Sequence, residues 1–241
     1  MTSTSTLVVF TYNTPHLKTQ DILVELFLAG YENIKVIAAP LINIKHKANK
    51  KGFYSINTNV PRHPQELCNK FKFKYYVCPH DDYIYIKNSI KDANCDIAII
   101  AGARILNKEV IDLFKIGVIN YHPGPLPQTS GLDSLYWMIN NSIKPAVTAH
   151  FIDHKVDAGQ LIEEMEVEVS KFDTISILEY KLYSAQVKLH QNICKYMHTN
   201  ELPETNPIIR PVKNYQMDDR QRSAVLKNFS SWLTKYSIDK S

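Results

Sequence analysis

Glycine is scarce in this chain of 241 residues, which holds only seven glycines. None of them stands in residues 13–20, "NTPHLKTQ", directly after the first apolar run. Backbone amides that cradle a phosphate in such a turn depend on glycine, so this scarcity argues against a glycine-rich phosphate loop.

Long apolar runs are also missing, since no stretch approaches the length of a membrane span. The first residues, "MTSTSTLVVFTY", have neither the basic segment nor the small-residue cleavage site of a secretory signal. We therefore expect an unprocessed cytoplasmic protein that has no membrane partner.

Cysteine is sparse and scattered. The four positions form no C-x-x-C pair and predict buried free thiols in a reducing compartment; they are Cys68, Cys78, Cys95 and Cys194. The G-x-S-x-G turn of a serine nucleophile is absent as well. An attacking group would then come from a substrate or from water.

The net charge of +4 is modest. Its largest basic cluster, residues 45–51 ("KHKANKK"), has no interleaved aromatic residues, so a solvated loop is favoured over a nucleic-acid or anion surface. We expect no nucleic-acid partner, although a positive net charge suits a substrate that carries phosphates.

Apolar runs of strand length alternate with amphipathic helical segments along most of the chain. Expected strands cover residues 6–12, 33–40, 95–102, 115–122, 146–153 and 160–169, and expected helices cover residues 19–31, 132–141 and 174–197. Gly30 suits the left-handed end of the first helix. This alternation predicts an α/β fold with a Rossmann-like, mostly parallel sheet and helices on both faces.

The pattern changes after residue 200. Residues 201–221 hold three prolines and only short apolar runs, and residues 220–236 look helical again. We expect a catalytic α/β domain over residues 1–200 and a short extension, an arm and helix, over residues 201–241. The arm is our candidate for the interface of a homodimer.

Polar side chains close one of the expected strands. Asn120 and His122 end the strand of residues 115–122, and ligands of parallel sheets bind at such carboxyl ends. The following segment, "TAHFIDHKVDAGQLI", adds Thr148, His150, Asp153, His154 and Asp157. This placement favours a chemical role for Asn120 and His122.

Two kinds of site fit these residues. A metal site would use His122, His150, His154 and Asp157, but the H-x-x-x-H spacing needs a helix and the segment is strand-like. We therefore expect no metal. The favoured alternative is a hydrogen-bonded trio, in which a carboxylate orients and charges an imidazole while Asn120 donates to a developing oxyanion.

The run "NYHPGPLPQTSGLDSLYWMINN…VTAHFIDHKVDAGQLI" resembles the signature of the 10-formyltetrahydrofolate-dependent formyltransferases. The resemblance covers residues 97–162 approximately and implies the formyltransferase fold, with 10-formyltetrahydrofolate as formyl donor and no metal. It implies catalytic Asn120, His122 and Asp157, with Thr148 and His150 as supporting groups. The folate contacts that it implies are Arg104, Ile105, Leu106, Asp153 and Val156.

Within this family the chain is most similar to the sugar-nucleotide N-formyltransferases. The purine branch has a glycine-rich phosphate loop after its first strand, which is missing here. The methionyl-tRNA branch carries a C-terminal β-barrel, and only about seventy residues follow Val169. The formyl-folate hydrolases have an N-terminal domain for which the chain leaves no room. A folate- or nucleotide-binding module without activity is the non-enzymatic alternative.

The resemblance therefore implies a dTDP-linked amino deoxysugar as acceptor, formylated for surface polysaccharide such as the O-antigen of lipopolysaccharide. Asn13 and His16 follow the first strand and either contact a pyrophosphate or cap the next helix. Pro123 and Gly131 belong to a proline-rich loop that would form a rigid wall of the acceptor pocket. His80 and Lys87 are further candidate contacts to the acceptor.

Overall fold

The computed structural model describes residues 6–40, 60–91, 93–103, 105–153, 159–199, 201–209 and 213–239. The basic cluster of residues 45–51 lies outside them. The chain forms two compact units, Thr4–Lys115 and Ile116–Ser241, called here the first and the second unit. The domain boundary that we expect from the sequence, between a catalytic domain of residues 1–200 and an extension of residues 201–241, stays a prediction.

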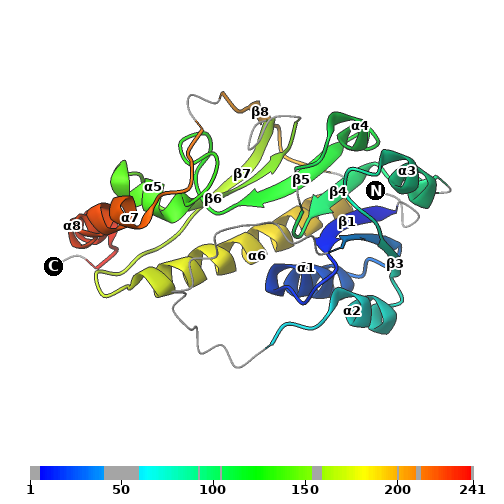
Figure 1. Cartoon of the computed structure of the whole chain (residues 1–241), viewed down its shortest axis with the longest axis horizontal. Helices are drawn as coiled ribbons and strands as arrows, with labels where there is room; N and C mark the ends of the chain where they lie inside the picture. The colour runs from blue at the N-terminus through cyan, green and yellow to red at the C-terminus, as the bar shows by residue number, and fades with distance from the viewer. Residues whose placement is uncertain are drawn as a thin grey trace. The chain divides into compact units, whose positions relative to one another are not determined.

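The first unit is a parallel α/β layer (Figure 1). Its elements are β1 Leu7–Tyr12, α1 Leu17–Leu28, β2 Ile34–Ala39, α2 Pro64–Phe71, β3 Lys74–Val77, α3 Tyr83–Ile90, β4 Ile97–Ile100 and α4 Lys108–Ile111. The strands pair in parallel in the order β3-β2-β1-β4. Every residue of β2 is buried, and so is every residue of β1 except Tyr12 at its end, as expected of strands covered on both faces.

Helices cover both faces of this layer. The chain steps from β1 to β2 to β3 in one direction and then returns past β1 to β4. Right-handed connections therefore place α1 and α2 on one face and α3 on the other. The packing of α1 on α2 and of α3 on α4 agrees with that arrangement (Figure 1). Gly30 follows α1 with a φ of +81°, as its position predicts.

The second unit is antiparallel. Its elements are β5 Gly117–His122, α5 Ser134–Asn140, β6 Ala146–Phe151, β7 Gln160–Glu166, α6 Ile175–Thr199, β8 Asn206–Pro207, α7 Asp219–Leu226 and α8 Phe229–Tyr236. The strands pair in the order β5-β6-β7-β8. The long helix α6 packs on β5, β6 and β7, and α7 packs on α5 (Figure 1).

The predicted α/β, Rossmann-like fold is confirmed, with parallel pairing in the first unit and antiparallel pairing in the second. One expected helix, residues 220–236, is divided. Lys227 is the C-cap of α7 and Asn228 is the N-cap residue of α8, whose side chain makes no capping bond. None of the helices in the described residues combines the length and the apolarity that crossing a membrane requires.

Candidate active site

Asn120 and His122 stand at the carboxyl end of β5. Side chains alternate between the two faces of a strand, so these two share a face while Tyr121 between them takes the other. Tyr121 is buried, and its hydroxyl lies 2.8 Å from Nδ1 of His190 on α6. Asn120 and His122 therefore lie on the face of β5 that is turned away from α6.

The loop after β5 holds the imidazole of His122, which is only 3% exposed. Its Nε2 lies 2.9 Å from Thr129 O and 3.1 Å from Ser134 Oγ. A carbonyl oxygen only accepts, so Nε2 carries the proton and donates to Thr129 O. The loop thus sets both the orientation and the tautomer of the ring. Thr129 and Ser134 are contacts that the sequence did not predict.

The neighbouring strand supports the same two residues. In the antiparallel register Asn120 pairs with His150 and His122 pairs with Thr148. The Asn120 amide nitrogen, Nδ2, donates to His150 Nε2 over 3.2 Å. The Thr148 hydroxyl donates to Gly124 O over 2.8 Å. Both supporting side chains are buried, so β6 orients the amide of Asn120 and anchors the start of the loop.

The C-terminal arm closes the far end of this loop. Gly131 forms a bridge with Asn214, in which Leu132 N donates to Asn214 O over 3.1 Å and Asn214 N donates to Ser130 O over 2.8 Å. The Asn214 side chain also donates to Gln128 O. The predicted rigid wall therefore owes its position to residues of the arm as well as to its own prolines.

An ion pair continues the contact between the arm and the loop. Arg222 Nη2 lies 2.8 Å from Asp133 Oδ1, and Met217 N donates to Asp133 Oδ2 over 2.8 Å. The guanidinium also sits 5.1 Å from the centroid of the Tyr136 ring. Asp133 is the N-cap of α5, in the left-handed conformation with φ of +56°. Arg222 of α7 thus holds the start of α5.

A cavity of about 400 Å³ opens beside this loop in the second unit. Its lining includes Pro123 and Gly131, two of the predicted acceptor contacts, and Ser134. Helix α6 adds the carboxyl group of Glu179, whose pKa is raised by burial and lowered to a smaller degree by Arg222. Nothing in the sequence marked Glu179, because its neighbours on α6 form an ordinary amphipathic pattern.

Two other predicted acceptor contacts follow β1 in the first unit. Asn13 Oδ1 accepts from the Tyr75 hydroxyl over 2.8 Å. His16 is the N-cap residue of α1, but its side chain makes no capping bond and lies 2.9 Å from Thr19 Oγ1. Burial, and secondarily the charge of Lys18, lowers the pKa of His16. His16 thus occupies the N-cap position without capping the helix through its side chain, and a contact to pyrophosphate stays a prediction.

The last two predicted acceptor contacts, His80 and Lys87, differ in their exposure to solvent. His80 is 1% exposed, with Nε2 3.2 Å from Ile37 O and its ring edge-on to Phe10, so it belongs to the core of the first unit. Lys87 is exposed on α3, over the Tyr83 ring.

The predicted folate contacts also differ in their exposure to solvent. Ile105 is 71% exposed and Leu106 is buried, while Asp153 is half-buried in the second unit. Three predicted residues lie outside the described residues, namely Arg104, Val156 and Asp157. Their roles stay predictions. Within the described ranges no three His, Cys, Asp or Glu side chains gather as metal ligands would, and His154 lies outside those ranges.

Comparison with known families gives this site its context. Residues 48–192, more than half of the chain, match the family model described as formyl transferase. The chain belongs to the formyl transferase family. The matched range contains Asn120, His122 and both of their partners on β6, so the predicted family is confirmed.

Curated relatives of this formyl transferase include members of two branches. The methionyl-tRNA formyltransferase of Flavobacterium psychrophilum is 34% identical over 95 residues, which cover 39% of this chain and 30% of that one. The phosphoribosylglycinamide formyltransferase of Bacillus subtilis is 24% identical over 102 residues, 42% of this chain and 52% of that one. The matched segment thus spans about half or less of these relatives.

Solved structures include sugar N-formyltransferases. The N-formyltransferase of Helicobacter canadensis, in complex with folinic acid and dTDP-3-aminofucose, has a TM-score of 0.61 at 17% identity and covers 88% of this chain and 70% of that one. A formyltransferase of Anoxybacillus kamchatkensis, in complex with UDP-4,6-dideoxy-4-formamido-L-AltNAc and tetrahydrofolate, has a TM-score of 0.55 at 18% identity, over 91% and 90%. At these identities the likeness establishes the shared fold.

Proposed function

We propose that the chain transfers the formyl group of 10-formyltetrahydrofolate to the amine of a nucleotide-linked amino deoxysugar, with a dTDP sugar as first choice. One observation carries the proposal. In a chain of this family, Asn120 and His122 share one face at the end of β5, with both side chains oriented by neighbouring groups.

The proposed mechanism uses these two side chains at the formyl carbon. Attack by the acceptor amine forms the new C–N bond and places negative charge on the formyl oxygen. Asn120 Nδ2 carries a second N–H besides the one donated to His150, and it donates to that oxygen. Protonated His122 is the second donor; it passes its proton to the departing folate nitrogen as the C–N bond to folate breaks, and it takes up the proton that the attacking amine gives up.

Asp157 completes the proposed trio by favouring the imidazolium form of His122. On the folate side, Ile105 provides an exposed apolar side chain next to the buried Leu106, which suits contact with a flat ring. Asp153, Arg104 and Val156 remain the other proposed folate contacts. No metal takes part in this mechanism.

The choice of an amino sugar has two supports. The neighbours from H. canadensis and A. kamchatkensis are bound to nucleotide sugars and align over most of this chain. In addition, α1 begins five residues after β1 ends, and the connection contains no glycine for a phosphate loop. A methionyl-tRNA acceptor and formyl-folate hydrolysis are the alternatives. Surface polysaccharide synthesis, a homodimer and a cytoplasmic location are parts of the same proposal.

The test is a panel of dTDP- and UDP-linked amino sugars incubated with 10-formyltetrahydrofolate and the purified chain. We expect one acceptor to gain the mass of a single formyl group. Asn120→Ala should lower kcat by roughly a hundredfold or more, because one oxyanion donor is lost. Asn140→Ala, an exposed asparagine on α5, is the matched control and should retain the full rate.

Other outcomes would redirect the proposal. Release of formate at the same rate with and without any amine would indicate a hydrolase. Formylation of methionyl-tRNA, with no sugar accepted, would place the chain in the tRNA branch. An unchanged rate in Asn120→Ala would contradict the assigned mechanism for every acceptor.

A further inference from the structure

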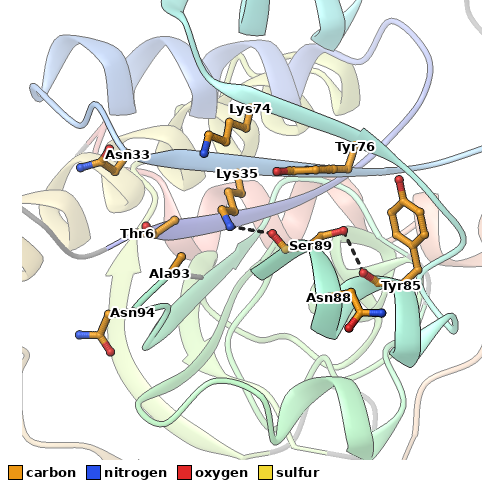
Figure 2. A pocket seen from close by; sticks show the side chains of 10 residues that line it. All are labelled: Thr6, Asn33, Lys35, Lys74, Tyr76, Tyr85, Asn88, Ser89, Ala93 and Asn94. Carbon is orange, nitrogen blue, oxygen red and sulfur yellow. Dashed lines mark hydrogen bonds between the residues drawn. The ribbon is translucent and has the colours of Figure 1, made fainter. Parts of the chain in front are cut away.

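Besides the cavity in the second unit, a polar groove lies in the first unit, at the amino ends of β1, β2 and β3 (Figure 2). Its volume is about 840 Å³, and the last turn of α3 closes one side. Asn13 and His16 follow the carboxyl end of β1, so this groove is at the opposite end of the same strands. No Asp or Glu occurs among the described residues that line it.

Two lysines stand side by side in this groove. Lys35 of β2 and Lys74 of β3 are register partners in the parallel pair, and both line the groove. Like charges at directly paired positions repel and destabilise a sheet. The described residues offer no compensating ion pair to either side chain. Lys74 is exposed, so solvent screens part of this repulsion, and an anion lying between the two charges would remove the rest.

Lys35 shows the cost most clearly, because it is only 7% exposed. Its ammonium donates to Ser89 O over 2.6 Å, and a carbonyl carries no full charge to balance it. An ammonium has three N–H donors, and the bond to Ser89 O occupies one of them. Buried charges in proteins are ordinarily paired.

Other donors point into the same space. Tyr76 lies two residues beyond Lys74 on β3, so both side chains share a face. Figure 2 shows Lys35, Lys74 and Tyr76 lining the same groove, with the Lys35 ammonium turned toward Ser89. Asn88 adds an amide, and the exposed ring of Tyr85 stands at the rim. Such a volume exceeds that of a free ion and leaves room for an organic group.

We propose that this groove binds a phosphate group of a small ligand, either inorganic phosphate or a phosphate ester such as a nucleotide. Lys35 and Lys74 together balance a doubly charged anion, and the Tyr76 hydroxyl donates a further hydrogen bond. The site uses residues 6–94 only. It does not depend on the proposed formyl transfer, and either proposal can fail without the other.

The test is titration calorimetry of the intact chain with inorganic phosphate and with adenosine monophosphate, against chloride at equal ionic strength. We expect saturable binding of phosphate, weakened about tenfold or more in Lys74→Met because a charged hydrogen-bond donor is lost. Lys70→Met, an exposed lysine on α2 outside the groove, should bind as the wild type does. Tighter binding of the nucleotide than of phosphate identifies a phosphate ester as ligand; equal or weaker binding identifies free phosphate.

Thermal unfolding gives an independent readout. In chloride alone, Lys74→Met should have a higher Tm than the wild type, because the repulsion of Lys35 is removed. In phosphate this order should reverse or vanish, since the wild type gains more from the ligand than the variant does. The proposal is overturned if phosphate binds no better than chloride, if Lys74→Met keeps full phosphate affinity, or if only a nucleic acid binds.

Discussion

Gly131 shows at the residue scale how the loop after His122 depends on one backbone conformation. Its φ is +111°, and a Cβ at this position would stand 2.0 Å from Asn214 O. Gly30 also has a positive φ, of +81°, but nothing lies within 4 Å of its missing Cβ. Substitution of Gly30 would cost only the free energy of a left-handed backbone, whereas substitution of Gly131 would also cost the free energy of displacing the arm.

We predict that Gly131→Ala destabilises the chain more than Gly30→Ala. The left-handed conformation costs roughly 1–2 kcal/mol at either position, and only Gly131→Ala must also push Asn214 away. Urea unfolding of both variants measures the difference. Gly131→Ala should further raise KM for the acceptor if this loop lines the acceptor pocket. Equal stabilities of the two variants would contradict the role assigned to the arm.

At the scale of elements, long and strongly apolar segments could be predicted from sequence, and short ones could not. The expected strands and helices around β1, α1, β4, β5 and α6 are all present. The pattern did not reveal α2, β3 and α3, because these are only four to eight residues long and rich in lysine, tyrosine and asparagine. Such short segments acquire their structure from packing on their neighbours, β3 on β2, α2 on α1 and β3, and α3 on α4, rather than from periodicity.

The ion pair between Asp133 and Arg222 is the clearest link between two elements. Both side chains are largely buried, at 16% and 26% exposure, and the guanidinium contacts both carboxylate oxygens. Removing one partner of such a pair leaves a charge without compensation. Arg222 should therefore determine how firmly α7 and the arm rest on α5 and the loop.

We predict that Arg222→Gln lowers the free energy of unfolding by about 1–3 kcal/mol, the cost of a lost hydrogen bond to a charged group. Arg220→Gln, an exposed change on the same helix, should alter it by about 0.5 kcal/mol at most. Amide hydrogen exchange in residues 213–226 should accelerate in Arg222→Gln only. Similar exchange in both variants would show that the arm is held by other contacts.

At the scale of the whole molecule, burial controls the chemistry of the thiols. All four cysteines are free and buried, as the sequence predicts. Burial raises the pKa of Cys68 to about 12 and that of Cys78 to about 11, because a thiolate there would lose its solvation. The neutral thiols therefore contribute stability below pH 9, where an unfolded thiol is also protonated, and this contribution is lost as pH rises toward 11 and 12.

We predict that iodoacetamide modifies the native chain at pH 8 far more slowly than the chain in urea, since only a thiolate reacts, burial raises the pKa of Cys68, Cys78 and Cys95, and all four thiols are buried. Intact-mass measurement follows the modification. The free energy of unfolding should fall between pH 9 and pH 11, and fall less steeply in Cys68→Ala. Rapid modification of the native chain at pH 8 would contradict the burial of these residues.

The sequence by itself determined the fold class, the family motif and the position of Asn120 and His122 on one face of a strand. Each of these depends on local spacing, because a strand alternates its side chains every two residues whatever surrounds it. Only the tertiary structure placed His150 beside Asn120, Asn214 against Gly131, and Lys35 beside Lys74. Strand register and the path of the arm bring these partners together across long stretches of chain, and no local pattern encodes which distant residues meet when apolar faces pack.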